Sequence, residues 1–267
     1  MVNNDASLEK YSFSKLSSFH TCKYGFKLKY IDHLEGEGNC FSSYGLLMHS
    51  LLERYAKGEF EIWDLAGIFD WEFDTAIPEE FPPNEFCDLR KTYYEQGLEY
   101  LKNFQGYDKF DVLGVEEEFS IPIDDWLFNG IVDLIYIDED GRLVICDHKS
   151  KAKFKSREEQ KKYTRQLYLY AYFVHQKYGR YPDILKFNMF RKQNEVVVPF
   201  VKAEFDEAIE WARQTVKDIR ACFDYKPTCE SFFGNHLCNH REYCEYKAPP
   251  EQKKNTYNKY RKARGIR

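Results

Sequence analysis

Apolar and polar positions repeat along this chain with two different periods, which together predict a mixed α/β protein. Apolar residues three or four positions apart, the spacing of a helix with one buried face, occur in residues 44–57, 86–106, 157–178 and 203–222. Apolar and β-branched runs typical of strands occupy residues 111–123, 130–137, 143–149 and two stretches within 184–202. This order of helices and strands indicates a central mixed sheet flanked by helices.

Residues 130–151 give the clearest strand pattern, two apolar runs joined by a tight turn. Residues 138–141, sequence DEDG, supply the turn, and the glycine can adopt the positive φ that such a turn requires. Charged residues interrupt the apolar pattern at three positions. Asp133 lies inside the first run, and Asp147 and Lys149 close the second.

These charged positions are candidates for a metal site. A carboxylate inside an apolar strand costs several kcal/mol unless a partner or a cation compensates it. Side chains alternate along a strand, so Asp147 and Lys149 are expected on one face and His148 on the other. Aspartates from neighbouring strands could converge on Mg²⁺ or Mn²⁺, with the lysine offsetting charge on a phosphate. The alternative is a hairpin with a solvated aspartate and a surface salt bridge.

Four other residues gain a catalytic role only if the fold brings them to these aspartates. His49 lies on a predicted helix and is otherwise a structural histidine. Glu116 begins a run of three glutamates, which otherwise form an exposed strand edge. Gln166 and Tyr170 are four positions apart and share one helix face, which otherwise belongs to an aromatic core.

Length and composition are those of a globular chain. The 267 residues are 43% hydrophobic and 18% aromatic, enough for one large domain or two small ones. The amino terminus has no apolar signal segment, and no run approaches the length of a membrane span. We therefore expect a cytoplasmic protein with no membrane partner.

The formal net charge of −5 conceals two basic stretches. Residues 149–165 contain eight Lys or Arg and two Glu, a balance of +6, and residues 247–267 contain eight and one, a balance of +7. Local stretches of this kind, rather than the total charge, attract nucleic acid. The first stretch adjoins the candidate site, while the second could equally be a solvated chain end.

Eight cysteines are present, and in a cytosolic chain they are not expected to form a disulfide framework. They are Cys22, Cys40, Cys87, Cys146, Cys222, Cys229, Cys238 and Cys244. Cys146 lies in an apolar strand and is expected in the core. Cys229, Cys238 and Cys244 are grouped near the carboxyl end, and this grouping needs a separate explanation.

Six short motifs resemble those of the PD-(D/E)XK nuclease superfamily, and within it the RecB-type exonuclease group, which includes phage and CRISPR-associated exonucleases. They are SFSKLSSFHTC at 12–22, GLLMHSLLE at 45–53, VEEEF at 115–119, GIVD at 130–133, DHK at 147–149 and QLYLY at 166–170. Each motif alone is weak, but the six occur in the right order over nearly the whole chain. The resemblance implies a restriction-endonuclease-like α/β core.

The resemblance implies one nuclease domain in residues 1–246, with a basic tail at 247–267. Helical, cysteine-bearing segments from the two ends of the chain would close around the core. The cysteine cluster would occupy residues 229–244.

The resemblance also assigns a metal site. His49, Asp133 and Asp147 would ligate Mg²⁺ or Mn²⁺, with the main-chain carbonyl of His148 as a further ligand. The implied reaction is phosphodiester hydrolysis, in which a metal-activated water attacks phosphorus.

Further residues would act beside the metal. Lys149 would be the catalytic lysine, and Glu116 would be the acid of the preceding strand. Gln166 and Tyr170 would lie near the substrate.

Many members of this group also hold an iron–sulfur cluster on four cysteines. One comes from the amino-terminal segment and three from a carboxyl-terminal C-x2-C-x5-C. Cys22 matches the first position, and Cys238 and Cys244 supply the C-x5-C. The remaining position falls on Asn235, so Cys229 would have to be the fourth thiolate of a [4Fe–4S] cluster.

Two other interpretations of these cysteines stay open. His236 and His240 lie among them, so Zn²⁺ is one alternative, and thiols without a metal are the other. A cluster would be structural, joining the first segment of the chain to the last.

The implied function is a metal-dependent DNA exonuclease in DNA repair, recombination or phage DNA processing. Its substrate would be DNA with a free end, and a helicase or recombination partner would be a separate chain. The runner-up is a non-catalytic nucleic-acid-binding module on the same fold, against which the intact Asp133, Asp147 and Lys149 argue. A third interpretation is an endonuclease of the restriction type.

Overall fold

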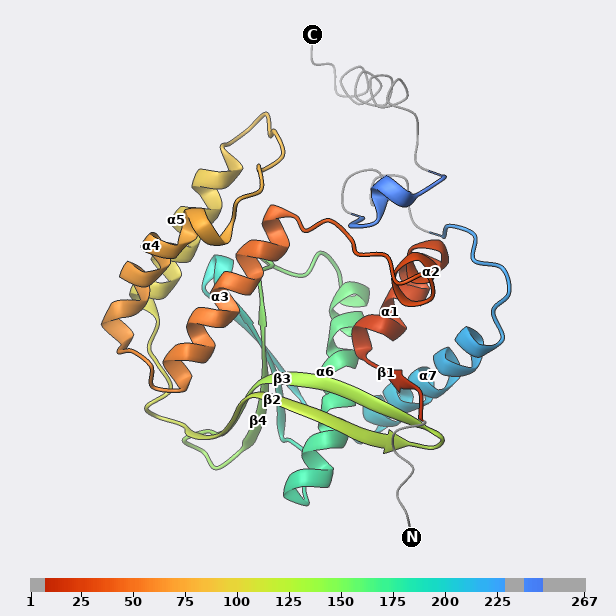
Figure 1. Ribbon diagram of the computed structural model, residues 1–267. Helices are drawn as coiled ribbons and strands as arrows, with labels where there is room; N and C mark the ends of the chain where they lie inside the picture. The colour runs from red at the N-terminus through yellow and green to blue at the C-terminus, as the bar shows by residue number, and fades with distance from the viewer. Residues whose placement is uncertain (1–7, 229–237, 247–267) are drawn as a thin grey trace. The chain divides into compact units, whose positions relative to one another are not determined.

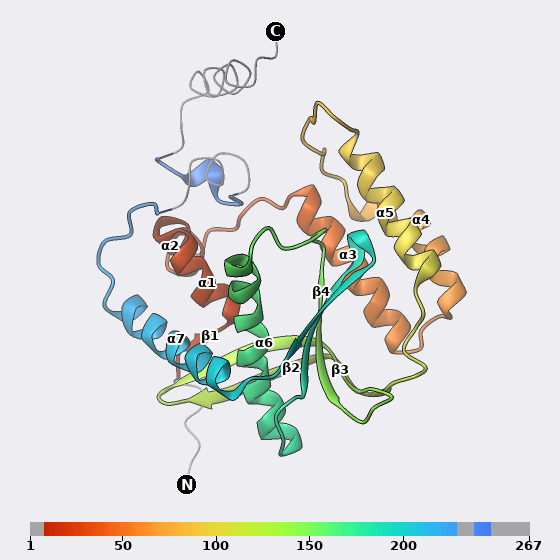
Figure 2. The same ribbon diagram turned by 180° about the vertical axis from the view of Figure 1, so that it is seen from behind.

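The computed structural model describes residues 8–228 and 238–246 and is drawn in Figures 1 and 2. The chain divides into two compact units, described separately below. Unit 1 comprises Met1–Phe13 and Gly38–Val216, and unit 2 comprises Ser14–Glu37 and Lys217–Arg267. The predicted basic tail at 247–267 lies outside the described residues.

Unit 1 contains the sheet and most of the helices. In chain order its elements are β1 (Lys10–Tyr11), α3 (Cys40–Ala56), η2 (Ile62–Asp64), α4 (Leu65–Ala76), α5 (Leu89–Asn103), β2 (Asp111–Ile123), β3 (Trp126–Ile137), β4 (Leu143–Lys149), α6 (Arg157–Tyr178), β5 (Ile184–Met189), η3 (Phe190–Lys192), β6 (Asn194–Pro199) and most of α7 (Lys202–Arg220).

A mixed six-stranded sheet forms the centre of unit 1, which confirms the predicted fold class. The strand order is β1-β3-β4-β5-β6, and β2 pairs with β3 off this path. The β1–β3 and β4–β5 pairs are parallel, and the other three pairs are antiparallel. Gly141 in the turn between β3 and β4 has a φ of 76°, as the DEDG sequence predicts.

The edge of β3 opposite β2 is shared by two shorter partners. β1 pairs with Leu127 and Phe128, and β4 pairs with residues 134–137. Within the described part of the chain, residues 129–133 of β3 have no ladder partner on this edge. This interruption ends at Asp133, where the candidate site lies.

The two faces of the sheet are covered differently. Helix α6 packs against β4 and β5 (Figure 2). On the other face Tyr136 and Cys146 belong to an apolar cluster, and Phe110 from the loop before β2 stacks on Tyr136 with 4.4 Å between ring centroids. Helices α3, α4 and α5 enclose a further core that includes Leu51, Phe69 and Tyr93.

Strand 111–123 and helix 157–178 match residue for residue, and the other predicted helices and strand 130–137 differ by up to four residues at an end. Two predictions were incomplete. Helix α3 begins at Cys40, inside a predicted loop, because Asn39 caps it by accepting hydrogen bonds from the backbone of Phe41 and Ser42. Helix α4 was not predicted. Its apolar Trp71 is 81% exposed, so the sequence pattern does not clearly indicate a buried face.

Unit 2 joins the two ends of the described chain. It contains nearly all of α1 (Phe13–Thr21), α2 (Lys23–Tyr30), the end of α7 and η4 (Arg241–Tyr243). The backbone N–H of Glu37 donates to the Asn239 carbonyl at 2.8 Å, and His240 Nε2 donates to the Leu34 carbonyl at 3.0 Å. These bonds fix the carboxyl-terminal segment on the amino-terminal one.

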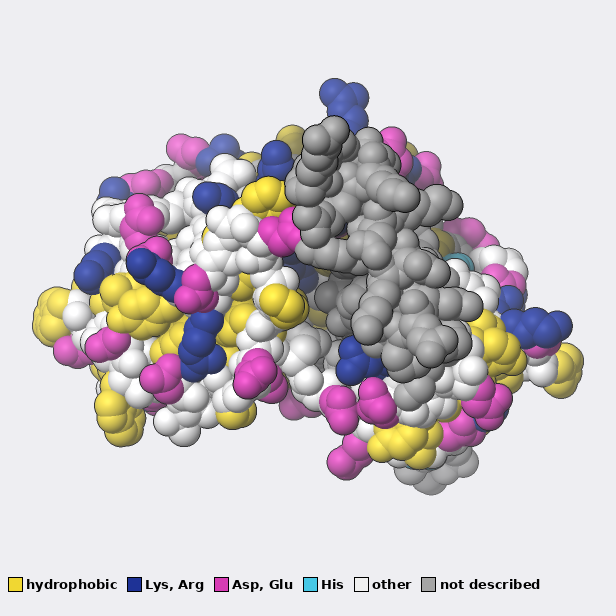
Figure 3. Space-filling model, turned by 90° about the horizontal axis from the view of Figure 1, so that it is seen from above, with side chains coloured by type: hydrophobic (Ala, Val, Ile, Leu, Met, Phe, Trp, Pro, Cys, Tyr) yellow, Lys and Arg dark blue, Asp and Glu magenta, His cyan; other side chains and the backbone are white. Residues whose placement is uncertain are grey.

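The surface of unit 1 mixes side chains of different kinds. On the left of Figure 3, hydrophobic side chains lie among acidic and basic ones. Among the described helices, none combines the length and the apolar character that crossing a bilayer requires.

Candidate active site

The Asp133 side chain accepts a hydrogen bond from the β4 backbone at a position where a neighbouring strand would otherwise pair with it. Main-chain pairing between the two strands ends at Leu134 and Cys146. Beyond that point the backbone N–H of His148 donates to Asp133 Oδ2 at 2.6 Å. The Asp133 side chain is only 11% exposed. A buried carboxylate is thus fixed where the two strands separate.

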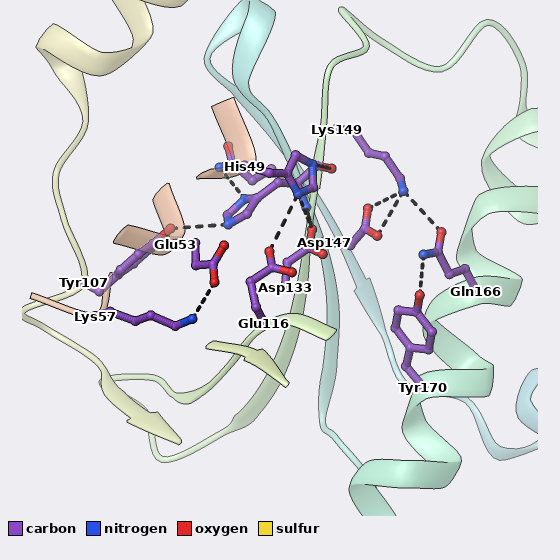
Figure 4. Close-up of polar contacts among 12 residues, drawn as sticks. His49, Glu53, Lys57, Tyr107, Glu116, Asp133, Asp147, Lys149, Gln166 and Tyr170 are labelled. Carbon is purple, nitrogen blue, oxygen red and sulfur yellow. Dashed lines mark hydrogen bonds and ion pairs between the residues drawn. The ribbon is translucent and has the colours of Figure 1, made fainter. Parts of the chain in front are cut away.

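His49 reaches this carboxylate from α3 (Figure 4). Its Nε2 lies 2.9 Å from the His148 carbonyl oxygen, and because a carbonyl can only accept, Nε2 carries a hydrogen. Its Nδ1 faces Asp133 Oδ2 at 3.5 Å. A histidine that donates one ring N–H to a carbonyl and turns its other nitrogen toward carboxylates is oriented for metal ligation.

Glu116 is the acid of β2 that joins this group. Its Oε1 lies 3.9 Å from His49 Nδ1, while Glu117 pairs with Lys177 and Glu118 is exposed. The φ of Glu116 is 46°, in the left-handed region that costs a residue with a Cβ about 1–3 kcal/mol. The surrounding ladder maintains this strained conformation beside the site.

Asp147 and Lys149 share one face of β4, as the alternation predicts. Lys149 Nζ lies 2.7 Å from Asp147 Oδ2 and donates to Oδ1 at 3.0 Å. The Asp147 side chain is 4% exposed and that of Lys149 is 18% exposed. The pair is therefore largely desolvated, and each group compensates the charge of the other.

The two predicted α6 residues hold the lysine from its other side. Lys149 Nζ donates to Gln166 Oε1 at 3.2 Å, and Gln166 Nε2 donates to the Tyr170 hydroxyl at 2.8 Å (Figure 4). The Tyr163 ring lies under the same ammonium, with 5.5 Å between Nζ and the ring centroid. The ammonium is thus fixed by a carboxylate, an amide and an aromatic face.

Burial and mutual repulsion shift the protonation of these groups. Burial raises the pKa of Asp133 to about 7, and the charge of Asp147 adds to the increase. Burial alone would lower the pKa of His49, but the nearby carboxylates of Glu116, Asp133 and Asp147 raise it. Burial would also lower the pKa of Lys149, which the ion pair with Asp147 raises instead. The cluster accumulates negative charge that favours a bound cation.

The donor atoms fit a divalent metal ion. One atom each from His49, Glu116 and Asp133 lies within 4.8 Å of the other two. Asp147 is outside this group. Its buried Oδ2 forms the ion pair with Lys149 but accepts no well-directed hydrogen bond. Carboxylate oxygens with one imidazole nitrogen suit Mn²⁺ or Mg²⁺.

Sequence reasoning missed two residues behind the site, Tyr107 and Asn188. His148 turns to the opposite face of the sheet, as strand alternation predicts, and its ring contacts both of them there. Asn188 lies in the apolar run FNMF, so it carries the same signal that identified Asp133, a polar residue inside a predicted strand.

The predicted cysteine ligands fall in unit 2 where they are described. Cys22 is buried at the start of α2 and accepts a hydrogen bond from the Gly25 backbone at 3.4 Å. Burial raises the pKa of Cys238, and nearby Cys22 and Cys244 raise it further. Cys229 lies outside the described residues, as do Asn235 and His236.

One contact joins the segment after Cys22 to the described segment that ends at residue 228. The backbone N–H of Lys23 donates to Thr228 Oγ1 at 3.2 Å. The residue that follows Cys22 therefore contacts the residue that precedes Cys229.

The fold is similar to that of a solved structure. A protein from Eubacterium rectale with the provisional name of exonuclease matches with a TM-score of 0.53 at 12% identity, covering 93% of this chain and 92% of its own. A second structure, SSO0001, matches with a TM-score of 0.35 at 17% identity, covering 76% of this chain and 96% of its own. At these identities the first likeness concerns the fold alone.

The sequence gives no match among curated proteins. The family model of the PD-(D/E)XK nuclease superfamily, however, matches residues 10–248, most of the chain. This match includes the strands and helices that carry all the candidate active-site residues described above. The chain belongs to the PD-(D/E)XK nuclease superfamily.

Proposed function

We propose that this chain is a metal-dependent DNA exonuclease in DNA repair, recombination or phage DNA processing. The observation that carries the proposal is the half-buried cluster in which donor atoms of His49, Glu116 and Asp133 lie within 4.8 Å of one another. The Lys149 ammonium stands beside it, paired with Asp147. A module that only bound DNA would gain nothing from burying these charges together.

Each residue of the cluster has a proposed role. His49, Glu116 and Asp133 would hold Mg²⁺ or Mn²⁺, with Asp147 as a further carboxylate. When bound, the ion would supply charge stabilisation at the phosphate and lower the pKa of an attacking water. Lys149 would offset the negative charge that develops on the phosphate.

The remaining predicted residues act around this set. Gln166 and Tyr170 would keep the Lys149 ammonium aimed at the phosphate. The His148 carbonyl already accepts a hydrogen bond from His49, so only its second lone pair is left for the ion.

The basic stretch 149–165 supports DNA as the substrate. Lys149, Lys151 and Lys161 are each paired with a carboxylate. Three other exposed cations, Lys153, Arg157 and Lys162, have no carboxylate partner among the described residues. Unpaired cations next to a nuclease site are available to contact backbone phosphates.

We also propose that Cys22, Cys229, Cys238 and Cys244 hold a structural [4Fe–4S] cluster. Nearby Cys22 and Cys244 both raise the pKa of Cys238, so these three thiols interact electrostatically. Four cysteine thiolates are the ligands that a [4Fe–4S] cluster requires. A zinc site on the same cysteines is the alternative.

Degradation of end-labelled DNA tests the nuclease proposal. The wild type should shorten linear single-stranded DNA with Mg²⁺ or Mn²⁺, leave a covalently closed circle of the same sequence intact, and stop when EDTA is added. Cleavage of the circle would indicate an endonuclease instead. Preferential cleavage of a matched RNA would overturn DNA as the substrate. Binding without cleavage under every metal condition would favour the binding module.

A further inference from the structure

His148 connects two of the proposed metal ligands through its own backbone. Its N–H donates to Asp133 Oδ2 at 2.6 Å, and its carbonyl accepts from His49 Nε2 at 2.9 Å. In a regular antiparallel sheet both groups would pair with the neighbouring strand. Here the β3–β4 ladder has ended at Leu134 and Cys146, so two side chains replace that strand.

The His148 ring is anchored on the face of the sheet away from Asp147 and Lys149. Its Nδ1 lies 2.9 Å from Asn188 Nδ2, and its Nε2 lies 3.4 Å from the Tyr107 hydroxyl. The same Asn188 nitrogen donates to the Tyr100 hydroxyl at 2.6 Å. An amide nitrogen has two hydrogens to donate, so Nδ1 accepts and Nε2 carries the ring hydrogen toward Tyr107.

This anchor is buried and rests on the strand register. His148 is 4% exposed and Asn188 is 8% exposed. The parallel register of β4 with β5 places the two residues side by side. The anchor borders a cavity of about 300 Å³ that is lined by Tyr100, Tyr107, Cys146 and Lys186 among others, and by none of the proposed metal-ligand side chains.

We propose that Asn188 and Tyr107 are positioning residues that act on the metal site through His148. By fixing the ring on one face of the sheet, they fix the direction of the His148 N–H and carbonyl on the β3 side. Those two groups in turn orient Asp133 and the Nδ1 lone pair of His49. The inference rests on the proposed metal site, and it explains why a polar network is buried where an apolar residue would pack.

Titration calorimetry with Mn²⁺ tests the inference on the full chain without DNA. Asn188→Leu should weaken Mn²⁺ binding about tenfold, the low end of the effect of losing a partner that orients a metal ligand. His148→Phe should weaken it similarly. The double variant should bind like either single variant, because both substitutions remove one coupling. Fully additive losses, or unchanged binding by Asn188→Leu, would overturn the proposal.

Two further variants keep the result interpretable. Asn103→Leu removes an amide on the rim of the same cavity that donates to Gln193 and contacts none of the proposed site residues among the described residues, so it should bind Mn²⁺ like the wild type. An equal loss in this variant would indicate general damage and overturn the specific role. Tyr107→Phe removes one hydroxyl and keeps the ring, and it replaces Asn188→Leu if that variant does not fold. Wild-type affinity in Tyr107→Phe would then overturn the proposal.

The calorimetry separates this proposal from the function on which it rests. A wild type that binds no Mn²⁺ would contradict the metal site itself and the anchor with it. A wild type that binds Mn²⁺, with variants that bind equally well, would leave the metal site standing and remove only the anchor.

Discussion

The two polar clusters of this chain differ in how much of their charge the protein itself compensates. In the active-site cluster of unit 1, Lys149 neutralises Asp147, and the His148 N–H supports Asp133. In the cysteine cluster of unit 2, the sulfurs of Cys22 and Cys244 raise the pKa of Cys238 further. Thiolates so placed repel one another unless a cation holds them.

This difference indicates which of the two clusters the protein can arrange without a bound metal. The active-site cluster is largely preorganised, because Asp133, Asp147 and Lys149 already have a hydrogen-bond or ion-pair partner. Losing one catalytic group should therefore change activity more than structure. If the cysteines hold the cluster that we propose, their arrangement depends on it, so losing one of them should change stability more than chemistry. The following predictions test the contrast, from the largest expected effect to the smallest.

Lys149→Met should lower kcat about 10²–10³-fold, the cost of removing one donor that stabilises charge in the transition state. Binding of DNA should persist, because other cations of residues 149–165 remain. Single-turnover cleavage and a parallel binding assay measure the two effects. Lys102→Met, at an exposed lysine of α5 outside this stretch, is the control and should cleave normally. Near wild-type cleavage by Lys149→Met would remove this lysine from the mechanism.

Cys238→Ser should lose the brown colour and iron of an anaerobically purified protein and lower its melting temperature by several degrees. Each kcal/mol of lost stability corresponds to about 2–4 °C in domains of 150–250 residues. Iron analysis and thermal unfolding measure both. Cys87→Ser, at an exposed cysteine, should change neither. A colourless wild type without iron contradicts the cluster, and stoichiometric zinc would establish the alternative.

Gln166→Ala should lower kcat about tenfold, in line with the roughly 1.5–3 kcal/mol of a hydrogen bond to a charged group. It removes the second contact of the Lys149 ammonium and leaves the ion pair with Asp147 in place. Gln176→Ala, on an exposed face of the same helix, is the matched control. Equal kcat in the two variants would show that the ion pair alone positions the lysine.

Asp138→Asn should cost about 1 kcal/mol of unfolding free energy at neutral pH, the scale of one net hydrogen bond. Burial alone would raise the pKa of Asp138, but hydrogen bonds from the Arg142 backbone and guanidinium lower it. A lowered carboxyl pKa stabilises the fold above the unfolded value of about 3.9 and loses that effect as the pH falls through the folded value.

Urea unfolding from pH 7 to pH 3 measures this pH dependence. The difference between wild type and Asp138→Asn should stay constant down to about pH 5 and then shrink toward zero in more acidic solution. A difference that grows on acidification would contradict the assigned sign.

The strand and helix periods predicted most of the fold because burial enforces them. Strand alternation placed Asp147 and Lys149 on one face and His148 on the other, and their contacts confirm this arrangement. The four-residue spacing of Gln166 and Tyr170 likewise predicted that they share a face. Helix α4 was missed because its exposed Trp71 disrupts the apolar pattern.

The long-range part of the site could not be predicted from local patterns. Glu116 was one of three adjacent glutamates, and its left-handed backbone conformation and its approach to His49 distinguish it only in the structure. The anchoring of His148 by Asn188 depends on the register between β4 and β5, which neither strand specifies by itself. The carbonyl of His148 was predicted as a metal ligand. The structure shows in addition that this carbonyl accepts a hydrogen bond from the His49 ring.

The most direct test of the account is metal-dependent cleavage of end-labelled single-stranded DNA by the wild type and by Asp147→Ala. The two proteins should be compared at equal DNA occupancy and with matching circular dichroism spectra. The account predicts that the wild type releases label only with Mg²⁺ or Mn²⁺ and that Asp147→Ala releases none. Equal release by Asp147→Ala, or release by the wild type that survives EDTA, would contradict the proposed site.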